Sequence, residues 1–408
     1  MIELITIVAC VGLVAYAYVL YPILMRFWST RMGRTWETDD RIRPSFSIIL
    51  AVYNEEAVLP QCLEALTSLV YPQDAVEILV GSDGSTDRTD SLIREFALAH
   101  PQLTYYSFHQ RRGKIAVVND LVSRAHGELL FFTDADVTLD PPCLQCHARH
   151  YADATLGGVA GNLLLSGEEG IRSEPLGSEQ YYMSVENRLR MDEASLHSTV
   201  GIFGGHYSIR HSLWSELPDE PICDELYIAL TIIQAQKRMV FERTATAREH
   251  FGRSMTEEFQ RKARFAARGV ATLLHFPRLL SPSSGWPAVM LWSHKLLRWL
   301  APFAFAVLMV ASVVVLLRED STFWVRPLIL AEAAGLLLII AGLLLNVLHR
   351  PLPILSHVYW FAIMNVAFGV GLLRFVFRRE KPLWTPSTRV RVMMPLNDPL
   401  VREEALHS

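Results

Sequence analysis

Apolar residues gather at both ends of the chain. No charged residue lies between Leu4 and Met25, and an uncharged run of this length can cross roughly 30 Å of hydrocarbon as a helix. Three further apolar stretches follow in the C-terminal part, at residues 299–317, 323–348 and 352–373. The pattern therefore predicts four membrane-spanning helices, with a long polar segment between the first and the second.

The charges beside these runs predict their orientation. Glu3 precedes the first run and no small-x-small cleavage site follows it, which indicates a retained anchor rather than a signal peptide. Arg26, Arg31 and Arg34 come just after the anchor, so the positive-inside rule places the following domain in the cytoplasm. The basic C-terminal tail also prefers the cytoplasm, whereas three crossings would place it outside. The sequence leaves open whether the number of C-terminal crossings is odd or even, since one of the three segments can be re-entrant or lie in the interface.

Between residues 45 and 250 the pattern alternates between short β-rich runs and amphipathic stretches of helix length. It predicts strands at 46–52, 76–82, 128–133 and 158–165, and helices at 57–69, 87–99 and 114–125. This order predicts a parallel α/β sheet. Ligands of such sheets bind beyond the C-terminal ends of the strands, so the polar residues that follow each strand are the candidates for chemistry.

The chain is thus expected to have five parts. They are an N-terminal transmembrane helix (1–28), an α/β domain (40–252), amphipathic interface helices (253–298), three apolar membrane segments (299–378) and a basic tail (379–408). Residues 286–298 mix Trp, His, Lys and Arg with aliphatic residues, as is typical of a helix at headgroup depth. Glu332, inside an apolar run, is expected to be a helix-end or helix-interface carboxylate, with Arg326 as a candidate partner, rather than a residue with a transport role.

Composition excludes several classes of protein. Of 408 residues, 51% are hydrophobic, and the mean hydropathy of +0.22 is too high for an average soluble domain. A net charge of -4 gives no basic field, so no nucleic-acid partner is expected. Five cysteines are too few for a disulfide framework, which favours a reducing compartment for the polar part.

Asp134 and Asp136 follow the predicted strand 128–133 and are separated by one residue. Two carboxylates at such a strand end repel each other unless a cation lies between them. Mg²⁺ or Mn²⁺ would suit the pair, because these ions need few protein ligands when a diphosphate supplies the other oxygens. The alternative is an ordinary polar turn, since Asp is common in loops.

Two further candidates have equally simple alternatives. Asp83 begins the run D-G-S-T-D, which is either a glycine turn in which Asp87 caps the next helix or a site whose carboxylate accepts a hydrogen bond from the imide N–H of uracil. Lys114 begins a predicted helix and is either a solvated cation or a group that helps to neutralise a diphosphate. Cys143, Cys146 and His147 spell the haem-attachment pattern C-x-x-C-H, which we interpret as an incidental helix surface rather than a haem or zinc site.

Taken in order, these groups resemble a membrane-embedded family 2 glycosyltransferase with a GT-A fold, a group that includes cellulose, hyaluronan and poly-N-acetylglucosamine synthases. The resemblance covers nearly the whole chain. Its motifs here are SIILAVYNEE (47–56), VGSDGSTDRT (80–89), RGKIAVVN (112–119), FFTDADVTLDP (131–141), FGGHYSIRHSL (203–213), CDELYIAL (223–230), RKARF (261–265), SHKLLRWL (293–300) and WTPSTR (384–389).

The resemblance implies a role for each site residue. Nucleotide-sugar contacts are expected from Glu55, Asp83, Lys114, Asp134 and Arg264. A metal is expected on Asp136, with Asp134 beside it. The acceptor floor is expected at Gly204, Gly205, His206, Tyr207 and Phe265. The general base is expected at Glu225, with Asp224 still in contention because the family has Asp at the second acid and the longer Glu moves the carboxylate.

The chain departs from the processive members at RKARF. Those members carry Gln-x-x-Arg-Trp, whereas the register here gives Arg261, Arg264 and Phe265, with Gln260 one residue away. Arg264 keeps a cation for the leaving diphosphate, but Phe265 lacks the indole N–H. This difference puts long-chain processivity in doubt.

The expected function is inverting transfer of a sugar from a UDP-sugar to a growing polysaccharide or glycan, by an integral membrane enzyme whose catalytic domain is cytoplasmic. One alternative is a single transfer to a lipid acceptor, and another, of a different class, is an inactive membrane scaffold or exporter subunit. The expected partners are the UDP-sugar, a glycan or lipid-linked acceptor and the bilayer. A homo-oligomer or an export partner stays open.

Overall fold

The computed structural model describes residues 2–166, 174–250, 255–317, 326–348, 350 and 352–379. Most of the predicted basic tail and the WTPSTR motif lie outside the described residues. One mixed sheet, in the order β3-β2-β1-β4-β7-β6-β8-β5, forms the centre of the polar domain. The strands are β1 (Phe46–Val52), β2 (Val76–Asp83), β3 (Leu103–Phe108), β4 (Leu129–Thr133), β5 (Val137–Leu139), β6 (Leu156–Ser166), β7 (His206–Arg210) and β8 (Arg238–His250).

The predicted α/β order is confirmed, with one correction to the expectation of a parallel sheet. β1 pairs in parallel with β2 and β4, and β2 pairs in parallel with β3. β7, which the pattern did not predict, is antiparallel to both β4 and β6. β5 is also antiparallel to its neighbour β8. β7 was missed because it is a five-residue strand with polar residues, too short for a periodic signal.

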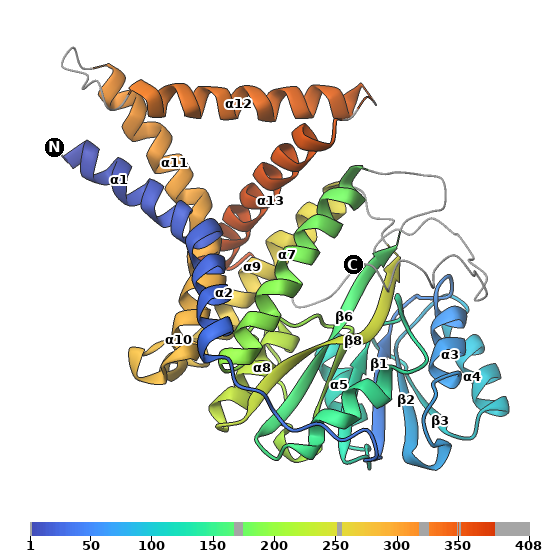
Figure 1. Ribbon diagram of the computed structural model, residues 1–408. Helices are drawn as coiled ribbons and strands as arrows, with labels where there is room; N and C mark the ends of the chain where they lie inside the picture. The colour runs from blue at the N-terminus through green and yellow to red at the C-terminus, as the bar shows by residue number, and fades with distance from the viewer. Residues whose placement is uncertain are drawn as a thin grey trace.

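Helices pack on the sheet, and further helices lie beyond it on one side (Figure 1). α3 (Leu59–Thr67), α4 (Thr89–Ala99) and α5 (Lys114–Val122) correspond to the three predicted helices. The other helices of the polar domain and its border are α6 (Cys143–Ala148), α7 (Glu174–Leu196), α8 (Asp224–Gln234) and α9 (Met255–Leu274). α7 packs on β6 and β8 and also contacts α13, so it links the sheet to the apolar helices.

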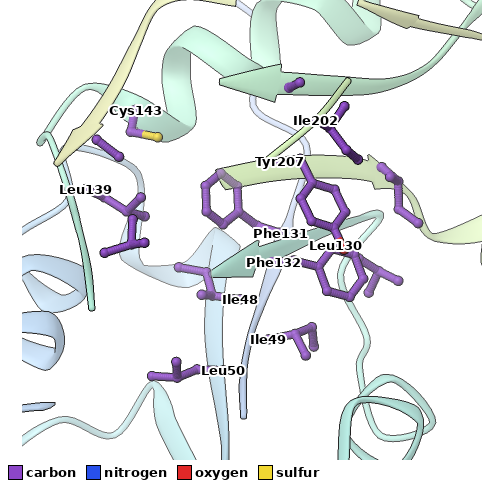
Figure 2. Packing of buried hydrophobic residues seen from close by; sticks show 14 of the residues in the cluster. Ile48, Ile49, Leu50, Leu130, Phe131, Phe132, Leu139, Cys143, Ile202 and Tyr207 are labelled. Atoms are coloured by element: carbon purple, nitrogen blue, oxygen red, sulfur yellow. The ribbon is translucent and has the colours of Figure 1, made fainter. Parts of the chain in front are cut away.

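The core of the sheet consists of continuous apolar strands. β1 and β4 are buried along almost their whole length, as expected of central strands covered on both faces. Ile48, Leu130 and Phe131 are fully buried here (Figure 2). The rigid strands therefore fix where the polar residues at their C-terminal ends lie.

Within the described ranges, four helices are long and apolar enough to cross a membrane. They are Ile2–Met32, which consists of α1 (Ile2–Ala15), a π-helical turn and α2 (Tyr21–Met32); Trp286–Leu316, which consists of α10 (Trp286–Met290), a π-helical turn and α11 (Leu297–Leu316); α12 (Arg326–Val347); and α13 (Pro353–Val376). In Figure 1, α1, α11 and α13 project from the polar domain, and α12 lies at the far end of α11 and α13.

The first two of these helices meet at their π-helical turns, η1 (Tyr16–Leu20) and η7 (Leu291–Leu296). The Tyr16 hydroxyl and Ser293 Oγ are 2.9 Å apart, and Arg298 Nε donates to the Ala17 carbonyl at 3.4 Å. Farther out, Glu332 accepts a hydrogen bond from Ser312 Oγ at 2.8 Å, as expected of a helix-interface carboxylate.

Candidate active site

The C-terminal ends of β1, β2 and β4 open into one cleft, and α7, α8 and α9 line its other side. The cleft has a volume of about 520 Å³. It is lined by every residue predicted to bind the nucleotide sugar or a metal, by both candidate bases, and by three of the predicted acceptor residues: Glu55, Asp83, Lys114, Asp134, Asp136, Gly204, Gly205, Asp224, Glu225, Arg264 and Phe265. Acids from distant parts of the sequence thus converge on one hollow.

Hydrogen bonds tie the loop after β1 to the loop after β2. Asn54 has a left-handed backbone (φ 53°), and its Oδ1 accepts from the Thr86 N–H at 2.8 Å. The Glu55 N–H donates to Thr89 Oγ1 at 2.9 Å. Asp87 Oδ1 accepts from the Thr89 N–H at 3.0 Å, a turn contact just before α4, whose N-cap position is Arg88 rather than the expected Asp87. These bonds hold the buried Glu55 at the edge of the cleft.

Asp83 ends β2 and holds the loop that leads to Lys114, the first residue of α5. Its two oxygens accept from the N–H groups of Arg112, at 2.7 Å, and Gly113, at 2.8 Å. Gly113 has φ 96°, a conformation that any side chain would strain. Because each carboxylate oxygen has two lone pairs, Asp83 keeps acceptor capacity toward the cleft.

The Lys114 ammonium lies between carboxylates from two other elements. Nζ is 2.8 Å from Asp134 Oδ1 and 3.5 Å from Asp224 Oδ2. Burial lowers the pKa of Lys114, but the negative charges of Asp134 and Asp224 outweigh burial, and the pKa is raised overall. Lys114 is therefore a fixed positive charge in the lining of the cleft.

The surroundings of Asp134 and Asp136 fit a hard divalent cation. Lys114 is in ion-pair contact with Asp134 and Asp224, while Asp136 and Glu225 line the same cleft. The negative charge also affects a neighbouring thiol. Burial and the charges of Asp136 and Asp134 raise the pKa of Cys62. Oxygen ligands in such surplus are what Mg²⁺ and Mn²⁺ prefer.

Asp224 and Glu225 are the first two residues of α8, where the positive end of the helix dipole favours acids. Burial raises the pKa of Asp224, but Lys114 and a hydrogen bond with Glu225 outweigh it and lower the pKa overall. Burial and the negative charge of Asp224 raise the pKa of Glu225. Two neighbouring carboxyl groups with opposite shifts are a pattern typical of acid–base sites.

Gly204 and Gly205 form the turn before β7 and face these acids. A β-carbon at Gly205 would lie 2.7 Å from Val137 Cγ2 and 3.2 Å from Asp134 Oδ2, so the turn can pass this close to Asp134 only without a side chain. A β-carbon at Gly204 would lie 3.7 Å from Glu225 Oε2.

The side chains of His206 and Tyr207 do not line the cleft, which corrects the expectation that they form the acceptor floor. Both are buried in β7, and the Tyr207 ring stacks on Phe132 with centroids 4.8 Å apart (Figure 2). The reason is that β7 pairs with β4, so that its side chains pack into the faces of the sheet.

α9 brings Arg264, Phe265 and Gln260 to the cleft. The Phe265 ring packs edge-on against Trp299, with centroids 6.0 Å apart. Gln260 Oε1 accepts from Arg374 Nη2 at 2.7 Å, which connects the cleft to α13. Gln260, one residue out of the family register, is therefore a cleft residue all the same.

The sequence interpretation missed the contribution of α7. Glu179, Glu186 and Arg190 line the cleft, and so does Lys295 of η7. The signal was present, because Glu179, Glu186 and Glu193 recur every seven residues, which places them on one helix face. All three are buried, whereas charged residues on one helix face normally indicate a face exposed to solvent.

From the sequence, the C-x-x-C-H segment is interpreted as a helix surface. The structure corrects this interpretation, because Cys143 and His147 are fully buried. Cys143 Sγ is 3.1 Å from His206 Nε2, and His147 Nδ1 is 2.8 Å from Ser208 Oγ. Burial raises the pKa of Cys143 and lowers the pKa values of both histidines. These residues therefore form an uncharged polar cluster in the core, behind the cleft.

Comparison with known proteins agrees with this geometry. Residues 47–214 match the model of the family Glycosyl transferase family 2. Glycosyltransferase AglE of Haloferax volcanii is 26% identical over 162 residues, which cover 39% of this chain and 52% of AglE. Poly-beta-1,6-N-acetyl-D-glucosamine synthase of Staphylococcus epidermidis is 32% identical over 117 residues, 28% of each chain. The aligned parts thus span about half of one relative and under a third of the other.

The overall architecture also has a solved counterpart. The mannosyltransferase PcManGT from Pyrobaculum calidifontis, solved in complex with GDP-Man and Mn²⁺, superposes with a TM-score of 0.71 at 20% identity, covering 92% of this chain and 100% of that chain. The polar domain therefore has a GT-A fold. Residues 47–214 thus match a family 2 glycosyltransferase domain, and the chain shares the fold of a solved mannosyltransferase.

Proposed function

We propose that the protein is an integral membrane enzyme that transfers a sugar from a UDP-sugar to a hydroxyl group of a glycan or lipid-linked acceptor, with inversion at the anomeric carbon. The observation that carries the proposal is the convergence of Asp134, Asp136, Lys114 and the pair Asp224–Glu225 in one cleft. Charge for a leaving diphosphate and a base for an incoming hydroxyl are what one displacement at an anomeric carbon requires.

On the donor side, the chain supplies positive charge from Lys114 and Arg264, both of which line the cleft. Asp136 and Asp134 would hold a divalent cation, which, when bound, neutralises part of the charge of the diphosphate. Lys114 is fixed by Asp134 and Asp224 before substrate arrives. Its position therefore needs little reorganisation as charge grows on the leaving group.

On the acceptor side, Glu225 would remove the hydroxyl proton. Its raised pKa makes it a stronger base than an ordinary carboxylate once it is ionised. Asp224, with its lowered pKa, would stay ionised beside Lys114. The Gly204–Gly205 turn leaves open space next to Glu225, as an acceptor approaching this acid requires.

The choice of UDP rests on Asp83, whose carboxylate can accept a hydrogen bond from the imide N–H of uracil. The solved mannosyltransferase carries GDP-Man instead, and guanine also offers an N–H that a carboxylate can accept from. The test is to incubate the purified full-length protein with a panel of UDP- and GDP-sugars, with and without EDTA, and to weigh the products by mass spectrometry. Turnover with GDP-sugars alone would overturn the uracil assignment.

Membrane insertion is proposed from the four apolar helices, and the cytoplasmic position of the catalytic domain from the arginines after the anchor. Labelling of Cys146, which is half-buried in the polar domain, from either side of sealed vesicles tests the orientation. Reaction only from the cytoplasmic side supports the proposal, and reaction only from the outside contradicts it. A variant with Cys10 replaced removes the half-buried thiol of the anchor from the signal.

The number of sugars that are added separates two acceptor classes. A relative named as a polymer synthase supports chain growth, whereas Phe265 at the processive Trp position supports a single addition to a lipid acceptor. A ladder of product masses would identify a polymerase, and a single increment would identify the other class.

A further inference from the structure

Two cations at one end of the cleft have donors that are not used within the described part of the chain. This end, which we name the helical end, is lined by residues of α7, α9 and η7, whereas residues at the ends of β1, β2 and β4 line what we name the strand end. Arg190 of α7 is 5% exposed and Lys295 of η7 is 7% exposed. Both side chains are thus nearly buried and both still line the cleft.

Arg190 has five N–H donors, of which only Nη1 has a hydrogen bond in the described structure, to Asn187 Oδ1 at 2.9 Å. Its Nε is buried without a partner among the described residues. The guanidinium lies over the Phe203 ring, 3.6 Å from the centroid. The stacking fixes the plane of the group and leaves most of its donors available.

Within the described residues, the Lys295 ammonium contacts an aromatic ring. Nζ lies 5.4 Å from the Phe265 centroid. Lys295 belongs to the π-helical turn η7, an irregularity that is frequent at functional sites. A buried ammonium without a carboxylate costs stability, so another role is expected to compensate for that cost.

The neighbouring acids are engaged by other donors. Glu186 Oε2 is 2.8 Å from His294 Nε2, and Glu186 Oε1 accepts a hydrogen bond from Arg298. Glu193 Oε1 is 2.7 Å from both the Tyr21 hydroxyl and His294 Nδ1. Arg190 and Lys295 are therefore a surplus of positive charge that these carboxylates do not neutralise by direct contact.

The two cations lie close to the reacting groups without touching them. A β-carbon at Gly201 would be 3.3 Å from Arg190 Nε and 3.4 Å from Lys295 Nζ, whereas one at Gly204 would be 3.7 Å from Glu225 Oε2. Three residues span at most about 11 Å. This bound places the cation pair and the proposed base beside the same short segment, residues 201–204, where one acceptor molecule can reach both.

The helical end also adjoins the apolar helices. Phe265 and Phe368 of α13 line it, and Lys295 is part of the helix that continues as α11. A ligand whose charge rests on Arg190 and Lys295 can therefore extend its apolar part along the helices that are proposed to lie in the membrane.

We propose that Arg190 and Lys295 bind the phosphate of a lipid-linked acceptor, and that this phosphate is a handle while a hydroxyl of the attached sugar is the nucleophile. The inference rests on the proposed function and names its acceptor class. A phosphate nucleophile would need no base, whereas the structure offers Glu225 at a distance from the cations. Cations without acids in contact, a stacked guanidinium and an apolar border are together suited to a phosphate on a lipid.

The step then balances in a simple way. The acceptor hydroxyl oxygen forms a bond to the anomeric carbon, and its proton passes to Glu225. The bond between the anomeric carbon and the donor phosphate oxygen breaks, and its electron pair leaves with the nucleoside diphosphate. The acceptor phosphate stays on Arg190 and Lys295, unchanged.

The experiment compares two acceptors with the purified full-length protein in phosphatidylcholine nanodiscs. One is a polyisoprenyl diphosphate that carries one sugar, and the other carries the same sugar and the same chain without phosphate. The donor is the nucleotide sugar found active in the panel described above. We expect the Michaelis constant of the neutral acceptor to be about 10- to 100-fold higher, the range of one or two charge-assisted hydrogen bonds.

The variants are Lys295→Met and Arg190→Met, with Lys295→Arg and Arg190→Lys as conservative counterparts and Arg278→Ala as a matched control. Arg278 is an exposed cation of the segment between α9 and α10, and it does not line the cleft. The Met variants should raise the Michaelis constant of the phosphate acceptor to the neutral level and leave that of the donor unchanged. They should be no less stable than the parent, because a buried cation without a contacting acid is replaced by an apolar chain.

Three results would overturn the inference. The first is an equal Michaelis constant for the two acceptors. The second is a change in the donor constant only, which would assign the cations to the donor diphosphate. The third is full inhibition of the phosphate-acceptor reaction by millimolar inorganic phosphate or by phosphatidylglycerol in the nanodisc, since the site would then not distinguish the acceptor from a free phosphate or a bulk headgroup.

Failure of the inference can be separated from failure of the proposed function. Slow, metal-dependent transfer of the sugar from the donor to water reports the donor site alone. If this hydrolysis persists in Lys295→Met and is lost in Asp136→Asn while the two acceptors behave alike, the function stands and the acceptor assignment falls.

Discussion

The two ends of the cleft differ in the sign of their excess charge. At the strand end, several carboxylates line the cleft; backbone hydrogen bonds position Asp83, and Lys114 positions Asp134. At the helical end, acidic and basic side chains from α7, η7 and α11 are buried together, and the charge left without an acid in contact among the described residues is positive. An excess of carboxylates attracts a metal ion, whereas an excess of positively charged side chains attracts an anion. One cleft can therefore hold a cation-bound donor and an anionic acceptor side by side.

The difference also concerns what holds the groups in place. Short loops between rigid strands fix the strand end, and a buried ion network fixes the helical end. Removing an acid is therefore expected to affect chemistry at the strand end, whereas removing an ion-paired member of the buried network, such as Glu186, is expected to affect stability at the helical end.

The largest effect is expected for the metal site. Asp136→Asn, or chelation by EDTA, should lower turnover by at least about 100-fold, because charge on the leaving diphosphate loses its counterion. Asp74→Asn, an exposed acid before β2 that does not line the cleft, is the matched control. Turnover that survives both treatments would remove a metal from the strand end.

The acid pair is expected to give the next largest effect. Glu225→Gln should lower turnover about 100-fold or more, since it removes the base. In the parent, the raised pKa of Glu225 places the acidic limb of the pH–rate profile above the range of an ordinary glutamate, and activity falls as pH falls through it.

Asp224→Asn removes one cause of that raised pKa, so the same limb should move to lower pH while turnover persists. Loss of activity at every pH in this variant, with Glu225→Gln active, would assign the base to Asp224 instead.

Glu186→Gln tests the helical end. It should destabilise the folded protein by about 3 kcal/mol, because the buried Arg298 loses the charge of its partner. Arg298 and His294 outweigh the effect of burial and hold the pKa of Glu186 well below its usual range. The stabilisation is therefore present above the pKa of an unfolded glutamate and is lost as pH falls, and the variant should flatten this dependence.

Thermal unfolding in detergent across pH measures both effects of Glu186→Gln. Arg26→Gln, at a half-exposed ion pair with Asp192, should cost less than about 1 kcal/mol. Equal costs for the two variants would contradict the contrast between the two ends.

The smallest expected effect concerns the turn between the two ends. Gly205→Ala should lower turnover about 10-fold with little loss of folded protein, because its β-carbon would push against Val137 and Asp134. Gly177→Ala, where a β-carbon would meet nothing within 4 Å, is the control and should raise helix stability slightly. An unchanged rate in Gly205→Ala would show that the turn tolerates displacement.

The sequence alone determined much of the strand end. Continuous apolar runs fix the central strands, since only a strand covered on both faces is apolar throughout, and the residues after each run meet at one edge because parallel strands end together. Asp83, Asp134 and Asp136 follow from this rule, and so does the α/β order. Glu225 and Arg264 were found only through the ordered motifs.

Only the tertiary structure decided the helical end and the interior of β7. Periodicity shows which residues share a helix face, but not whether that face meets solvent or another charged face. Glu186, Arg190 and Lys295 become a site because α7 and η7 pack together, although 105 positions separate Arg190 from Lys295. In the same way, His206 and Tyr207 are in the core because β7 pairs with β4. Such contacts between distant segments depend on how whole elements dock, and no local pattern encodes that.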